Sequence, residues 1–221
     1  MHSTEQHGPV ESRLAEVLRL AADGRFPPAD GKVERLASPK DPVGAVLAFT
    51  GHHLVAADVD RRWLSSALPA GDLSAPVAAS FLVALSRHIA AHPRSLDVVL
   101  AAVGDGAPPE LALEEAAPGF THPRLARATR YRREVRAFHD ADGAVLVLGR
   151  GLAGRNEVAI ELDARSWAQG RGRALARSAL GLVPPGEAVF AQVAPGNAAS
   201  IRCFLSAGYR PIGAEVLFAA D

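Results

Sequence analysis

The sequence has few residues of the kinds that build cross-links. Its single cysteine, Cys203, excludes a disulfide scaffold and a cysteine-built metal site. The low cysteine content makes the reducing cytoplasm the expected compartment. No run approaches the ~20 apolar residues that a membrane-spanning helix needs. Residues 1–13, MHSTEQHGPVESR, lack the apolar segment of a signal peptide. We therefore expect no membrane partner.

An excess of charge of one sign is also absent, because 24 basic residues balance 24 acidic ones. This balance excludes a general polyanion binder, and no nucleic-acid partner is expected. The charge is nevertheless uneven, since residues 122–177 hold twelve arginines against six acidic residues. Arginine binds phosphate through a planar fork. The stretch either contributes to an anion site or presents arginines on solvated helix faces.

The apolar pattern divides the 221 residues, 48% of them apolar, into two parts. Residues 1–107 show helical spacing at 10–22 and again after Ser74, with apolar strand segments at 44–58 and 95–103. They carry no catalytic motif. Residues 108–221 predict the order βαβββαβαβ, beginning with a possible strand at 110–116. We expect an α/β or α+β layer with mixed strand pairing.

Two histidines near the end of the second expected helix raise the question of a metal site. His88 and His92 are four residues apart, so we expect them to share a helix face. No third ligand and no H-E-x-x-H pattern accompanies them. No metal site is therefore expected.

A glycine motif at residues 149–154, GRGLAG, matches the dinucleotide fingerprint and follows an apolar strand. That fingerprint must open a helix, because the pyrophosphate binds at the helix N-terminus. The next residues, 156–163 (NEVAIELD), alternate polar and apolar side chains and predict a strand instead. The glycines are therefore expected in a hairpin, which argues against a nicotinamide cofactor.

A second glycine-rich segment, residues 169–174 (QGRGRA), follows that strand after a short loop and opens a helix. Glycines let backbone N–H groups approach a ligand closely. The first N–H groups of a helix have no partner within the helix, and its dipole favours an anion there. Arg171 and Arg173 add positive charge. The segment predicts a phosphate cradle, with an ordinary glycine-rich helix start as the alternative.

These residues resemble the acetyl-CoA motif of the GNAT acetyltransferase superfamily, Q/R-x-x-G-x-G/A after a strand. The similarity continues at residues 197–209, NAASIRCFLSAGY, where an Asn opens a helix and a Gly followed by an aromatic residue closes it. The resemblance is specific over residues 144–218 and reaches back to about residue 109. It implies an α/β fold with a mixed, splayed sheet and flanking helices, beside a smaller N-terminal α/β portion.

The resemblance also implies where acetyl-CoA, or another acyl-CoA, binds. The strands at 157–163 and 188–193 would diverge, and the pantetheine arm would pair with backbone at 162–164. The N–H groups of 170–174 would hold the pyrophosphate, and Asn197 would face the pantetheine or fix the start of its helix. The expected cofactor-binding residues are Leu162, Asp163, Ala164, Gln169, Gly170, Arg171, Gly172, Arg173, Ala174, Asn197, Ser200 and Phe204.

The catalytic residues depart from the family pattern. Many members use a tyrosine acid at the position of Phe204, which has no proton to give. Tyr209 is a substitute candidate, although aromatic residues at its position usually pack in the core. Glu157, Glu161 and Asp163 share one strand face and are candidate bases, Glu161 first because it lies mid-strand. Their alternative role is that of solvent-facing residues on a half-buried strand.

We therefore expect an acyl-CoA-dependent N-acyltransferase. It would transfer an acetyl group to a small-molecule or peptide amine by direct attack. The alternative is a CoA-binding sensor or interaction module that has lost turnover, which Phe204 favours. A purely structural protein would require both motifs to be coincidental. Members of the family often dimerise, so a homodimer is a further expectation from the resemblance.

Overall fold

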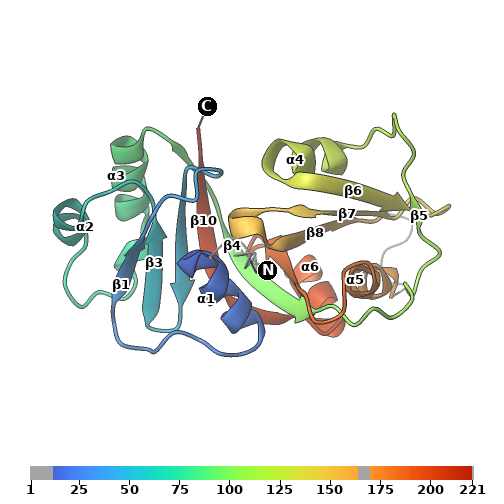
Figure 1. Cartoon of the computed structure of the whole chain (residues 1–221), viewed down its shortest axis with the longest axis horizontal. Coiled ribbons are helices and arrows are strands. Elements are labelled where there is room, and N and C mark those ends of the chain that lie inside the picture. The colour runs from blue at the N-terminus through green and yellow to red at the C-terminus, as the bar shows by residue number, and fades with distance from the viewer. Residues whose placement is uncertain (1–11, 164–169, 221) are drawn as a thin grey trace, which may run out of the picture.

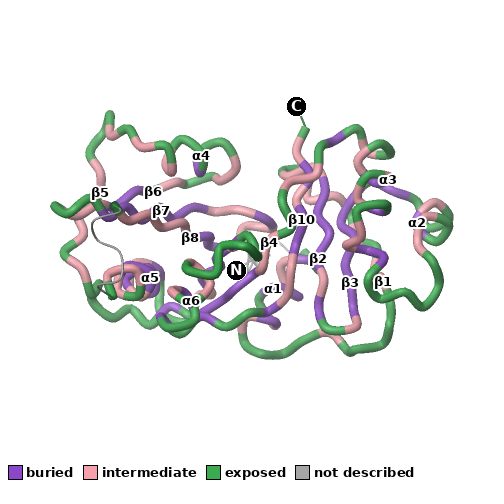
Figure 2. The backbone as a smooth tube through the Cα atoms, turned by 180° about the vertical axis from the view of Figure 1, so that it is seen from behind, coloured by how far each residue is buried: buried purple, intermediate pink, exposed green. Residues whose placement is uncertain are grey.

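The structure is a computed structural model that describes residues 12–163 and 170–220. These residues form one ten-stranded mixed sheet, in the order β1-β3-β2-β10-β4-β9-β8-β7-β6-β5. Helices lie on both of its faces (Figure 1). Buried backbone is concentrated in the central strands, whereas most connecting loops are exposed (Figure 2). The α/β class and mixed pairing predicted from the sequence are confirmed.

The first part of the chain supplies four of these strands. Its elements are α1 (Arg13–Ala22), β1 (Val33–Leu36), β2 (Gly44–Phe49), β3 (His52–Ala56), α2 (Arg61–Ala67), the 3₁₀ turn η1 (Ala75–Val77), α3 (Ala79–Ile89) and β4 (His92–Val103). The Oγ of Ser12 accepts a hydrogen bond from the Ala15 N–H and caps α1. The apolar stripe of α1 is buried, as its spacing predicts.

The expectation that His88 and His92 share a helix is wrong. Helix α3 ends at Ile89, because Ala90 takes the left-handed conformation with φ 49°. The chain then enters β4 at His92. No group of three or more His, Cys, Asp or Glu residues in the described part of the chain is placed to hold a metal ion.

The second part follows the predicted order closely. Its elements are β5 (Glu114–Glu115), α4 (Pro123–Tyr131), β6 (Arg133–His139), β7 (Val145–Arg150), the 3₁₀ turn η2 (Leu152–Gly154), β8 (Asn156–Glu161), α5 (Arg171–Gly181), β9 (Ala188–Val193), α6 (Ala198–Ser206) and β10 (Arg210–Ala219). The possible strand at 110–116 is reduced to the two residues of β5. The GRGLAG segment lies in the β7–β8 hairpin, as expected.

Strand β4 joins the two parts of the chain into one sheet. It pairs antiparallel with β9 through Val98↔Val193 and with β10 through Val98↔Ala214. Strand β10 in turn pairs with β2. A strand from residues 1–107 therefore lies between two strands from residues 108–221, and the loop around residue 107 does not interrupt the sheet.

The sheet splits between β8 and β9. These parallel strands are registered only at Asn156↔Val189 and Glu157↔Phe190, after which they diverge. The split that the resemblance implies is therefore present, between the two strands at which it was expected.

Different helices cover the two faces beside this split. Val158 and Ile160 of β8 pack in the cluster formed with α5 and α6. Ala128 of α4 packs on Val145 and Val147 of β7, on the opposite face. Helices α5 and α6 therefore lie on one face of the split and α4 on the other (Figure 1).

Candidate functional site

A cavity of about 670 Å³ lies at the split between β8 and β9. Val158 and Phe204 line it from the face covered by α5 and α6. Gln192, Arg127 and Tyr131 line it from the face covered by α4. The cavity therefore reaches through the sheet, and two ligands approaching from opposite faces can meet within it.

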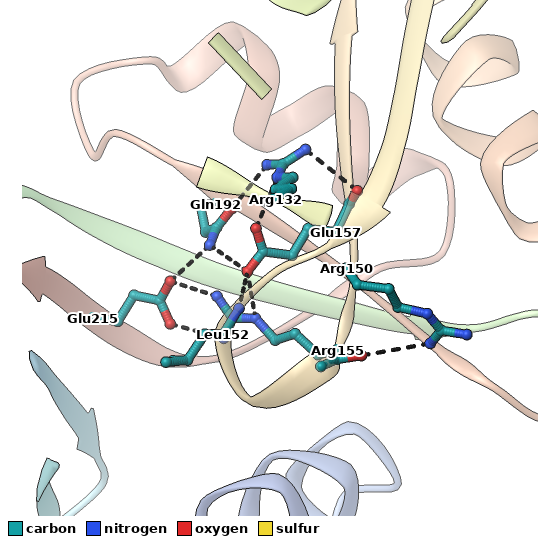
Figure 3. A network of polar contacts seen from close by, with 8 residues as sticks. Arg132, Arg150, Leu152, Arg155, Glu157, Gln192 and Glu215 are labelled. Atoms are coloured by element: carbon teal, nitrogen blue, oxygen red, sulfur yellow. Dashed lines mark hydrogen bonds and ion pairs between the residues drawn. The ribbon is translucent and has the colours of Figure 1, made fainter. Parts of the chain in front are cut away.

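A network of polar contacts borders the cavity and joins two arginines, two glutamates and Gln192 (Figure 3). Arg155 is 7% exposed and donates to both Glu157 and Glu215, with its Nε 2.8 Å from Glu157 Oε1. Arg132 Nε donates to the other oxygen of Glu157 at 2.8 Å. Gln192 Nε2 donates to both carboxylates at 2.9 Å. The network joins β8, β9, β10 and Arg132, the residue that follows α4, where the sheet divides.

Gly151 of the GRGLAG segment leaves the space that the Glu157 side chain occupies in this network. A Cβ on Gly151 would lie 2.1 Å from Cδ of Glu157, so only glycine fits there. The N–H of Leu152 donates to Glu157 Oε1 at 3.2 Å. The segment thus holds a carboxylate of its own chain.

Glu157, a predicted base, lines the cavity but has little freedom to accept a proton. Burial alone would raise the pKa of Glu157, but the charges of Arg155 and Arg132 outweigh burial and lower it. Four donors already occupy its two oxygens. This geometry favours a structural role for its carboxylate.

Glu161, the preferred base, lies at the end of β8 and is not among the residues lining the cavity. Its Oε2 accepts a hydrogen bond from Arg124 Nε at 3.0 Å, and its Oε1 lies 3.9 Å from His122 Nε2. Its side chain is 43% exposed. Glu161 is thus accessible to solvent but held by α4, and its role as base stays a prediction.

Tyr209, the candidate acid, packs in the core at 2% exposure. Its hydroxyl donates to the Ala176 carbonyl oxygen at 3.3 Å, and its ring meets Phe204 edge to face. Burial strongly raises the pKa of Tyr209. This placement favours the packing role, and it is Phe204 that lines the cavity.

The first turn of α5 is the segment that the sequence predicts as an anion cradle. Gly170 is its N-cap in the left-handed conformation, with φ 73°, and nothing lies within 4 Å of where its Cβ would be. The first N–H groups of the helix have no acceptor within it. Backbone donors at a helix N-terminus suit an anion such as the pyrophosphate of an acyl-CoA.

The arginines of the cradle have partners of their own. Arg171 pairs with Asp140 and Asp142 in the β6–β7 turn. Arg173 Nη2 lies 3.1 Å from Glu110 Oε2, and its side chain is 51% exposed. A bound pyrophosphate would compete with these carboxylates, so the backbone donors are the constant part of the cradle.

Gly172 serves packing on the inner side of the same turn. A Cβ there would lie 3.0 Å from Cys203 Sγ and 3.3 Å from Leu162 Cδ1. A large side chain at Gly172 would therefore separate α5 from α6 and β8. This position does not supply a clean test of ligand binding.

Three further pairs of predicted cofactor residues lie in different places. Asn197 and Ser200 line the cavity, and Asn197 Oδ1 accepts the Ser200 N–H at 3.1 Å, which fixes the start of α6. Leu162 is partly buried and Asp163 is exposed, just beyond β8. The other two cofactor predictions lie outside the described residues, namely Ala164 and Gln169.

Sequence reasoning missed the contribution of β4 to the cavity. Asp97 lines it beside Glu215, its register partner on β10, and its Oδ1 accepts from Ser95 Oγ at 3.2 Å. Burial is the largest effect on the pKa of Asp97 and raises it, as does the charge of Glu215, whereas the hydrogen bond from Ser95 and the charge of Arg127 partly oppose this rise. No local motif marks Asp97, because only the long-range insertion of β4 brings it to the site.

Comparison with known proteins finds matches among solved structures, two of which are described below. No protein-family model and no curated protein matches the sequence. A GCN5-related N-acetyltransferase from Kribbella flavida is 17% identical, with a TM-score of 0.40 and coverage of 63% of each chain. One from Sphaerobacter thermophilus is 15% identical, with a TM-score of 0.39 and coverage of 63% of this chain and 56% of that one. The chain spans less than two thirds of either protein.

The described helices also bear on the membrane expectation. None of them combines the length and the apolar character that crossing a bilayer requires.

Proposed function

We propose that this chain transfers an acyl group from an acyl-CoA, with acetyl-CoA the first candidate, to an amine. The observation that carries the proposal is the cavity passing through the split between β8 and β9. A thioester entering from the face of α5 and α6 would meet an amine entering from the face of α4. Such juxtaposition turns a bimolecular reaction into an effectively unimolecular one.

The cofactor side of the proposal rests on α5 and β8. The open N-terminus of α5 would bind the pyrophosphate, and the diverging edge of β8 has unpaired backbone groups for the pantetheine arm. Phe204 and Val158 offer apolar surface to that arm.

The chemistry requires one proton to leave and another to arrive. The amine nitrogen attacks the thioester carbonyl carbon, the C–S bond breaks, and the nitrogen loses a proton. Asp97 is our candidate proton acceptor, because its half-buried carboxylate lines the cavity and its raised pKa makes it a stronger base. Because Phe204 cannot donate, solvent would protonate the leaving thiolate.

The alternative is a module that binds CoA without turnover. It is favoured by Phe204 in the cavity and by the occupied carboxylate of Glu157. The two candidate functions differ in a single observable, the release of free thiol from acyl-CoA when an amine is added.

The test measures thiol release for the wild type, Asp97→Asn and Glu161→Gln. We expect kcat of the Asp97 variant to fall about 10²-fold or more, since general-base help is worth ~10²–10⁴-fold. Wild-type kcat should also decline on the acid side, as the Asp97 carboxylate becomes protonated. A larger loss in Glu161→Gln would move the base to Glu161. No thiol release with any amine, despite acyl-CoA binding, would support the binding module.

A further inference from the structure

The α4 wall of the cavity carries arginines without acidic partners. Arg127 and Arg130 lie about one turn apart on α4, and Arg94 comes from the start of β4. None of the three forms an ion pair with another described residue. Arg132 on the same wall differs, because it pairs with Glu157. The cavity therefore contains cationic groups that its own acids do not neutralise.

Tyr131 holds two of these arginines in place. The guanidinium of Arg94 lies 3.3 Å from the centroid of the Tyr131 ring, and that of Arg130 lies 5.5 Å from it. The proximity of the Arg94 guanidinium lowers the pKa of Tyr131, and the nearby charge of Arg130 contributes. A guanidinium that lies over an aromatic ring can still donate from its N–H groups to an anion. The stack also joins β4 to α4 across the cavity.

An irregularity in β4 directs Arg94 toward this place. Between Pro93 and Leu96, β4 has one residue more than the segment of β10 opposite to it. Such an extra residue shifts the alternation of side chains. Arg94 therefore lines the same cavity as Asp97, although the two are an odd number of residues apart.

These arginines are not placed to serve the phosphates of the cofactor. The cradle at the N-terminus of α5 lies on the opposite face of the sheet from α4. Its own arginines, Arg171 and Arg173, lie on α5. The cations on α4 and β4 therefore face the second ligand.

The unpaired cationic side chains of the cavity outnumber the unpaired acidic ones, and their positions suggest how an acceptor would be oriented. Of the charged side chains that line the cavity, those without an ion pair in the described structure are four cationic and two acidic. The cationic ones are Lys40 and the three arginines, and the acidic ones are Asp41 and Asp97. Asp97 lies deeper, beside Glu215 and near the split. An amine beside Asp97 and an anionic group beside the arginines would satisfy both ends of one small molecule.

We infer that the acceptor is a small amine that also carries an anionic group, a carboxylate or a phosphate, bound by Arg94, Arg127 and Arg130. This inference rests on the proposed function, whose acceptor it specifies. Arginine suits both anions, because its planar fork donates two parallel hydrogen bonds to either.

The test uses amines in matched pairs that differ only in the anionic group. Free α- and ω-amino acids are compared with their amides, and phosphoethanolamine with ethanolamine. For each pair, kcat/KM is measured by thiol release in the wild type, Arg127→Gln and Arg130→Gln. Arg62→Gln is the matched control, because Arg62 is exposed on α2, away from the cavity.

We expect the anionic member of at least one pair to be preferred. That preference should fall about tenfold in each α4 variant, as expected for one charge-assisted hydrogen bond. It should be unchanged in Arg62→Gln. The pair that shows the preference decides between carboxylate and phosphate. Equal use of both members of every pair, or a preference that survives both substitutions, would overturn the inference.

Two further readouts separate this inference from the proposed function. If Arg127→Gln instead weakens acyl-CoA binding, the arginines serve the cofactor and the inference is wrong. If no amine is acylated, the proposed function fails, and thermal unfolding with the same pairs tests binding alone. Stabilisation by an anionic member that Arg127→Gln loses would support the inference, and no such stabilisation would overturn it.

Discussion

At the scale of single residues, the site is governed by which charges are already satisfied. Glu157 looked like a base from its strand position, but its carboxylate also accepts hydrogen bonds from Arg132 and Gln192, which are 25 and 35 residues away in sequence. Strand alternation correctly placed Glu157 on the same strand face as Glu161. The alternation pattern could not show that buried arginines lie on that face and bind the carboxylate. Asp97 was missed for the same reason, since its neighbours are set by long-range pairing.

Substitution of Glu157 tests the structural role of this network. We expect Glu157→Gln to lower the free energy of unfolding by about 3–5 kcal/mol at pH 7, because buried arginines lose their partner. The pKa of Glu157 is lowered in the folded state. Its contribution is therefore present above the unfolded pKa of about 4.3 and lost as pH falls through the folded pKa. Urea unfolding as a function of pH measures this.

The control for that substitution is Glu134→Gln, since the Glu134 side chain is 78% exposed. It should change stability by less than about 1 kcal/mol. An equal effect of the two substitutions, or an effect of Glu157→Gln that does not diminish as the pH is lowered below the unfolded pKa of about 4.3, would contradict the role assigned to the network.

Tyr209 offers a direct test of the candidate acid. Its hydroxyl is buried on the Ala176 carbonyl oxygen. Tyr209→Phe should therefore cost about 0.5–1.5 kcal/mol of stability, the net value of one hydrogen bond, and leave kcat nearly unchanged. Steady-state kinetics beside thermal unfolding provides both quantities. A drop in kcat of about 10²-fold or more would restore Tyr209 as the acid.

At the scale of elements, the sequence predicted what local patterns encode. The start of α5, the hairpin at GRGLAG and the closing strand β10 follow from glycine positions and apolar spacing. The sequence did not predict how short β5 is, because Leu111 and Leu113 pack against the core without joining the sheet. The sequence also did not show which way Gly172 faces. Only the packing of α5 on α6 shows that it faces Cys203.

The left-handed cap of α5 makes an element-scale prediction. Gly170 and Gly196 both have open space around the Cβ position, but only Gly170 has a positive φ. Gly170→Ala should destabilise the protein by about 1 kcal/mol, because a Cβ is strained in that conformation. Gly196→Ala should be close to neutral. Chemical denaturation of both variants checks this, and equal effects would show that backbone strain is not the cause.

At the scale of the whole molecule, β4 makes the two parts of the chain interdependent. The sequence predicted a boundary near residue 107, and nothing in residues 1–107 indicated that their last strand lies between β9 and β10. Pairings between strands far apart in the chain leave no periodic signal. The same insertion brings Arg94 and Asp97 to the cavity, so the first part contributes to the site as well as to the fold.

Truncation tests this dependence. A chain beginning at residue 108 would lack β4 and expose the edges of β9 and β10, which favours aggregation. We expect it to be insoluble or unfolded by circular dichroism, whereas a chain beginning at residue 91 should keep more structure. Independent, cooperative folding of residues 108–221 would contradict the interdependence of the two parts.

The central claim is that an acyl-CoA binds at the split with its pyrophosphate on the first turn of α5. Calorimetric titration of acetyl-CoA into the wild type, Arg173→Glu and Arg177→Glu tests it most directly. Both arginines lie on α5 and pair with an acid, but only Arg173 lies in the first turn. The account predicts a loss of about tenfold in affinity for Arg173→Glu and little change for Arg177→Glu. No binding by the wild type at millimolar acetyl-CoA, or equal losses in both variants, would contradict it.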